Sequence, residues 1–98
     1  MGPRITINRN KDGEVEIWIN ESGRDLLVKE LSELNNRNDH FHLSEYGSNV
    51  GIPMRSKPYH STDEIFTSGK VLLRLDEWDA EFFPHVLDDS EELPTAQP

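Results

Sequence analysis

Residues 5–19, ITINRNKDGEVEIWI, decide the fold at the start of the chain. Both ends of this stretch alternate apolar and polar residues with a period of two, which is typical of β-strands. Between them, Asn10-Lys11-Asp12-Gly13 has the composition of a tight turn, in which Gly13 can adopt a positive φ. The stretch therefore predicts a β-hairpin. Its Val15, Ile17 and Ile19 face is apolar and needs a cover, and the opposite face is polar apart from Trp18.

The segment after the hairpin is expected to form the helix that covers the apolar face. Ser22-Gly23-Arg24-Asp25 resembles a capping box with Asp in place of the usual Glu, and Asn35-Asn36 marks the end of the pattern. We therefore expect a helix at about residues 23–35. The apolar residues that recur at the i, i+4 and i+7 spacing of one helix face are Leu27, Leu31 and Leu34.

The rest of the chain predicts short strands around a long loop. His40-Phe41-His42-Leu43 alternates polar and apolar residues, and residues 45–58 are rich in Gly, Ser, Asn and Pro, as loops are. Residues 70–75 form the clearest late strand, after a weaker candidate at 63–68. We therefore expect an α+β fold of order ββαββ. It would have a mostly antiparallel sheet of about four strands, one helix packed on one face, and an acidic C-terminal extension.

Length and composition restrict the classes of protein to which the chain can belong. A chain of 98 residues, 34% of them apolar, supports one domain with a modest core. The absence of cysteine excludes disulfides, cysteine-ligated zinc and thiol catalysis. A net charge of -9 argues against a nucleic-acid partner, because phosphate binding depends on Lys and Arg. Arg55 and Lys57, in the long loop, are too few to indicate nucleic acid.

The sequence also predicts a protein that does not enter a membrane. No apolar run approaches the roughly 20 residues that cross a bilayer. The first residues lack the apolar centre of a signal peptide, and the absence of cysteine fits a reducing compartment. We therefore expect a cytoplasmic location and no membrane partner.

The negative charge is concentrated at the C-terminal end. Residues 76–98 contain eight acidic side chains and no Lys or Arg, whereas residues 1–75 contain 11 acidic and 10 basic ones. In one interpretation the aromatic residues of this end seal the open end of the sheet, and the carboxylates keep the protein soluble. In the other, both kinds of residue form a surface for a basic partner. We assign residues 1–87 to one α+β domain and residues 88–98 to an acidic, disordered tail.

The second interpretation defines a candidate partner-binding surface. Complementary charge speeds an encounter, and buried aromatic side chains hold the complex. The Trp of the hairpin is a further contact candidate, unless the tail or a second copy of the chain covers it. The predicted partner-binding residues are Trp18, Asp76, Glu77, Trp78, Asp79, Glu81 and Phe82.

The histidines define the alternative, a metal site. In one strand His40 and His42 point the same way, so their imidazoles could share an ion, with Asp39, Glu45 or His60 as a third ligand. The other interpretation places both on the polar outer face of that strand. His60-Ser61-Thr62-Asp63 has the residue types of a hydrolytic triad, but neighbours in sequence do not thereby converge. With no catalytic motif present, we predict no enzyme activity, no catalytic residues and no cofactor.

Three parts of residues 12–47 form a recognisable combination: GEVEI at 13–17, the leucine helix, and NDHFHL at 38–43 followed by Glu45-Tyr46-Gly47. On these residues the chain resembles the small bacterial immunity proteins of the immunity protein 32 type, which are encoded beside polymorphic toxins. The resemblance implies neutralisation of a cognate toxin by binding, and it brings no catalytic residues. Its most specific part contains Asp39, His40 and His42, without assigning them to structure, metal or toxin.

The first functional hypothesis is therefore a non-catalytic protein-binding module. It would be an immunity protein that neutralises a basic toxin by occlusion, through an acidic and aromatic surface. The alternative is a small metal-binding protein or metal-dependent enzyme that uses His40, His42 and His60. A third possibility is a homodimer formed through an exposed strand edge.

Overall fold

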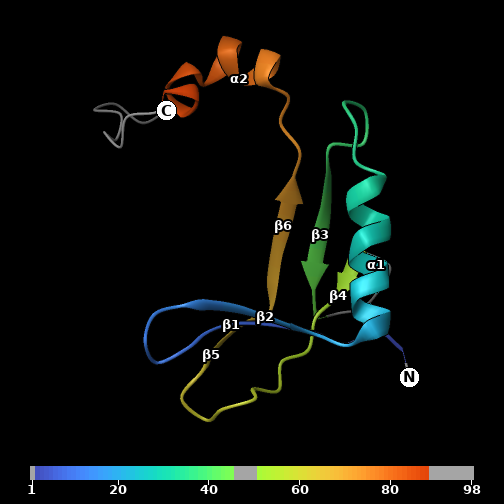
Figure 1. Cartoon of the computed structure of the whole chain (residues 1–98), viewed down its shortest axis with the longest axis vertical. Coiled ribbons are helices and arrows are strands. Elements are labelled where there is room, and N and C mark those ends of the chain that lie inside the picture. The colour runs from blue at the N-terminus through green and yellow to red at the C-terminus, as the bar shows by residue number, and fades with distance from the viewer. Residues whose placement is uncertain (1, 46–50, 89–98) are drawn as a thin grey trace.

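A computed structural model describes residues 2–45 and 51–88 of the chain (Figure 1). In these residues it contains two three-stranded sheets and two α-helices, so the expected α+β class is confirmed. One sheet of four strands and the order ββαββ are only partly matched, because the late strands divide between two sheets. The elements are β1 (Ile5–Arg9), β2 (Val15–Ile19), α1 (Glu21–Ser32), β3 (His40–Ser44), β4 (Gly51–Pro53), β5 (Glu64–Phe66), β6 (Ser68–Leu72), α2 (Asp76–Phe82) and the 3-10 helix η2 (Pro84–Leu87).

The two sheets are connected by the chain that runs directly from β5 of the first sheet into β6 of the second. The first has the order β2-β1-β5 and is antiparallel; the second has the order β4-β3-β6, with β3 parallel to β4 and antiparallel to β6. Only Thr67 separates β5 from β6, and its carbonyl accepts a hydrogen bond from the Glu45 N–H (3.0 Å). On the other side, the Arg55 N–H donates to the Ile5 carbonyl (2.8 Å). The sheets are thus joined at two places around a common core.

The core is small and lies between β1, β3, β4 and α1. Its buried apolar residues come from both sheets and from the residue after β4: Ile5, Phe41, Ile52 and Met54. Leu26 and Leu27 of α1 pack against this group, whereas Leu31 is exposed. The expected Leu27, Leu31 and Leu34 stripe is therefore wrong at Leu31. The helix instead turns Gly23, Leu26 and Leu27 toward the core.

Helix α1 begins two residues earlier than expected, and its N-cap is Asn20 and not Ser22. The Asn20 Oδ1 accepts hydrogen bonds from the N–H groups of Gly23 (2.8 Å) and Arg4 (2.9 Å). A Cβ at position 23 would lie 2.8 Å from the Arg4 carbonyl oxygen, so glycine permits this close approach of helix to strand. One side chain thereby caps the helix and fixes the start of β1.

The two faces of the hairpin agree with the sequence pattern at β1 and depart from it at β2. On the apolar face, Ile5 of β1 is fully buried and Ile7 packs against the core. The apolar face of β2 is open, with Val15, Ile17 and Ile19 exposed by 63%, 59% and 43%. On the other face Asn8 is fully buried, and its Oδ1 accepts a hydrogen bond from the Trp18 Nε1–H (2.9 Å). The expected cover of the apolar face by α1 is therefore wrong for Val15, Ile17 and Ile19, because α1 packs its leucines against the core around Ile5.

Residues 76–87, here called the C-terminal arm, comprise α2, Phe83 and η2. They follow β6 through residues 73–75 and lie at the far end of the molecule from the β1–β2 hairpin (Figure 1). The molecule measures 43 × 34 × 20 Å along its principal axes. Of the predicted tail, residues 89–98 lie outside the described residues. No helix in the described ranges is long and apolar enough to cross a membrane.

The burial pattern predicts opposite effects for two isoleucines of the hairpin. Replacing the fully buried Ile5 by Ala is expected to cost about 2–5 kcal/mol of unfolding free energy. Replacing Ile17, 59% exposed, by Ala is expected to cost less than about 1 kcal/mol. Urea unfolding of both variants measures the difference. Equal losses would show that the open face of β2 is covered in solution.

Candidate functional site

The C-terminal arm brings aromatic and acidic side chains together. Trp78 and Phe82 lie one helical turn apart with ring centroids at 4.9 Å, and the Phe83 ring lies 5.4 Å from that of Trp78. Pro84 follows at once and cannot continue the helix. The negative charge of the first turn favours the helix start through the helix dipole, and its residues are Asp76, Glu77 and Asp79.

These side chains are available to a partner. Trp78 and Phe82 are 38% and 54% exposed, and the neighbouring Leu75, Val86 and Leu87 are exposed as well. The rings of Trp78, Phe82 and Phe83 contact one another, and Trp78 also contacts Arg74 at the end of the second sheet. In the described part of the chain, no ion pair involves the acidic side chains of α2, which are Asp76, Glu77, Asp79 and Glu81.

Arg74 connects the C-terminal arm to the sheet. Its guanidinium carbon lies 4.7 Å from the centroid of the Trp78 ring, a cation–π contact, and its Nη1 donates to Asp39 Oδ2 (3.1 Å). The other carboxylate oxygen, Oδ1, lies 2.8 Å from His40 Nδ1. The hydrogen bond from His40, followed by the charge of Arg74, holds the pKa of Asp39 below its usual range. Asp39 thus contacts both His40, at the start of β3, and Arg74, which holds Trp78 of the arm.

The three candidate metal ligands are not brought together. His40 and His42 do share one face of β3, with ring centroids 5.2 Å apart, and both are exposed. His60 lies beside Trp18 on the other sheet, with its Nδ1 3.6 Å from Asp63 Oδ2. Across residues 2–45 and 51–88, no group of three or more His, Cys, Asp or Glu side chains is placed to hold a metal ion. The pair therefore matches the polar outer face of a strand, with Phe41 buried behind it.

The residues with hydrolytic composition form a local turn. The Asp63 carboxylate accepts a hydrogen bond from the His60 N–H (3.1 Å), and the Asp63 N–H donates to the His60 carbonyl (3.0 Å). These bonds close the chain before β5. They account for the Asp63 side chain as part of the turn.

Trp18 does not belong to the same surface as the C-terminal arm. Its ring is half-buried under Tyr59, with centroids 4.2 Å apart and planes 13° apart. Strand β2 lies at the opposite end of the long axis from α2 (Figure 1). Of the predicted partner-binding residues, the structure therefore groups the six from α2 and separates Trp18 from them.

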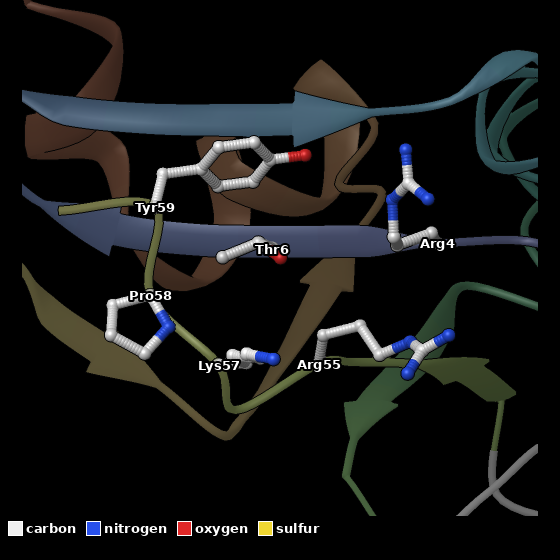
Figure 2. A pocket seen from close by; sticks show the side chains of 6 residues that line it. All are labelled: Arg4, Thr6, Arg55, Lys57, Pro58 and Tyr59. Carbon is white, nitrogen blue, oxygen red and sulfur yellow. The ribbon is translucent and has the colours of Figure 1, made fainter.

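Sequence reasoning missed a hollow beside Tyr59. It has a volume of about 440 Å³ and lies between the start of β1 and the segment after β4 (Figure 2). Its lining consists of Arg4, Thr6, Arg55, Lys57, Pro58 and Tyr59. Arg4 and Arg55 are far apart in sequence, so no local motif indicates that both line one hollow.

Comparisons with known proteins add no relative to these observations. No protein-family model matches the sequence, and no curated protein or solved structure matches the chain.

Replacing Asp39 by Asn is expected to lower the melting temperature near neutral pH more than in acid. Because its pKa is lowered by folding, the carboxylate stabilises the folded state above the unfolded pKa of about 4, and this stabilisation is lost as the pH falls through the lower, folded pKa. Melting curves of both proteins at neutral pH and at about pH 2 measure the difference. Asp12→Asn, in the exposed hairpin turn, is the control and should show no such pH dependence. If the melting temperature of Asp39→Asn stays below that of the unaltered chain by the same amount in acid as at neutral pH, this role is contradicted.

Proposed function

We propose that this protein is a non-catalytic binding module that neutralises a basic protein, a bacterial toxin, by covering it with the C-terminal arm. The single observation that carries the proposal is the combination of exposed aromatic rings with four carboxylates on α2. The resemblance of residues 12–47 to immunity proteins supplies the expectation that the partner is a toxin.

The apolar part of the arm supplies the expected binding energy. Exposed apolar patches on small proteins mark interaction sites, and aromatic residues dominate the energetics of interfaces. A standard interface buries about 800 Å² on each partner, roughly a tenth of the 7615 Å² accessible surface of this chain. The arm and the adjoining end of β6 are suited to an interface of that kind.

The charge of the arm indicates the sign of the partner. Four carboxylates on seven residues repel one another, and a basic surface would relieve this repulsion. Such a surface is expected around the active cleft of a nuclease, where substrate phosphates bind. An acidic arm seated there would exclude the substrate without any chemical step.

The attachment of the arm also favours binding. The contacts of Arg74 with Trp78 and Asp39 restrict the freedom of the first turn of α2 relative to β3. A surface held in its bound arrangement loses less conformational entropy when the complex forms. Arg74 is therefore proposed as a positioning residue for the interface.

Reversing two charges of α2 is expected to slow association with the toxin encoded by the neighbouring gene. Glu77→Lys with Glu81→Lys should reduce the association rate at low salt by about tenfold or more, and should weaken its dependence on salt. Surface plasmon resonance with that purified gene product measures both quantities.

Asp12→Lys with Glu64→Lys is the matched control, because it makes the same change in net charge on exposed residues of the hairpin sheet. The two double variants should differ clearly in association rate. The proposal is contradicted by the same rate for both, or by a gene product that does not bind the unaltered chain.

A further inference from the structure

Three of the ten basic side chains of this acidic protein meet at the hollow beside Tyr59. Arg4, Arg55 and Lys57 line it, and among the described residues no carboxylate does. Like charges placed together repel, and this arrangement is favoured when an anion binds between them. The segments that line the hollow, the start of β1 and the chain between β4 and β5, lie at the end of the molecule that carries the hairpin, away from α2 (Figure 1).

The three cations are not used by the described structure itself. None of them forms an ion pair within residues 2–45 and 51–88, whereas Arg24, Lys29 and Arg74 do. Arg4 also borders a neighbouring hollow together with Glu21, but no ion pair joins the two. The positive charge of the hollow is therefore free to meet a ligand.

The backbone holds two of the cations in place. The Arg4 N–H donates to the Asn20 side chain (2.9 Å), and the Arg4 carbonyl accepts from the Asn20 N–H (3.2 Å). The Arg55 N–H donates to the carbonyl of the fully buried Ile5 (2.8 Å). The side chains of Arg4 and Arg55 thus start from fixed backbone positions on either side of the hollow.

The other end of the hollow is apolar and aromatic. In Figure 2, Arg4 and Arg55 lie toward one end, and Pro58 and Tyr59 lie toward the other. The Tyr59 ring is fixed by its stacking on Trp18, whose Nε1–H is hydrogen-bonded to the buried Asn8. The hollow therefore matches a ligand with an anionic group at one end and an apolar, planar body at the other.

We propose that this hollow binds a small organic phosphate ester. Arginine forks match the oxygens of a phosphate, and Lys57 adds a third positive charge. The volume of about 440 Å³ falls in the range of small-molecule sites. A long polyanion is not the favoured ligand, because the chain as a whole carries a net charge of -9. The proposal does not depend on the toxin-binding function.

Binding of four probes to the full chain tests this site. Adenosine monophosphate and phenyl phosphate supply the ester, inorganic phosphate supplies the anion alone, and a single-stranded oligonucleotide supplies the polyanion. Titration followed by NMR is expected to show saturable binding of at least one ester, about tenfold tighter than inorganic phosphate. The shifts should centre on the amides around Tyr59.

Two matched variants decide whether the hollow is responsible. Arg55→Gln is expected to weaken ester binding about tenfold or more, because it removes a charge-assisted contact to the phosphate. Arg24→Gln removes an exposed arginine of α1 and should leave binding unchanged. Melting curves confirm that both variants fold. The proposal is overturned if neither ester saturates, if both variants weaken binding equally, or if only the oligonucleotide binds.

Discussion

Asn20 joins the first strand to the first helix, and the rest of the structure is arranged around that junction. Its carboxamide oxygen accepts from the Arg4 and Gly23 N–H groups at once, which a carboxamide can do because it has two lone pairs. The same contact places Ile5 in the core and Arg4 beside the hollow. The core, the helix and the basic hollow therefore depend on one capping side chain.

The small core explains why so much apolar surface remains open. A chain of this length has a high ratio of surface to volume, and its buried apolar residues number four among those described. The open side chains include the outer face of β2 and the C-terminal arm, besides Val28 and Leu31 of α1. The arm combines its open apolar side chains with the four carboxylates of α2, which form no ion pair within the described residues.

Local patterns in the sequence predicted the helices and strands better than they predicted which of these elements contact one another. The period-two alternation of residues 5–19 gave the hairpin correctly, and the leucine spacing gave a helix displaced by about two residues. The faces of the hairpin could not be predicted, because Tyr59 covers Trp18 from a segment far along the chain. The basic hollow could not be predicted either, because Arg4 and Arg55 are distant in sequence and come together only in the folded protein. The acidic and aromatic arm was visible because its residues are consecutive.

The central claim is that the C-terminal arm is the surface that contacts the toxin. Amide hydrogen exchange of the full chain, with and without the product of the neighbouring gene, tests it most directly. The account requires slower exchange in residues 76–87 when the partner is bound, with the amides of β2 unchanged. Protection confined to the hairpin sheet, with the arm exchanging as fast as before, would contradict it.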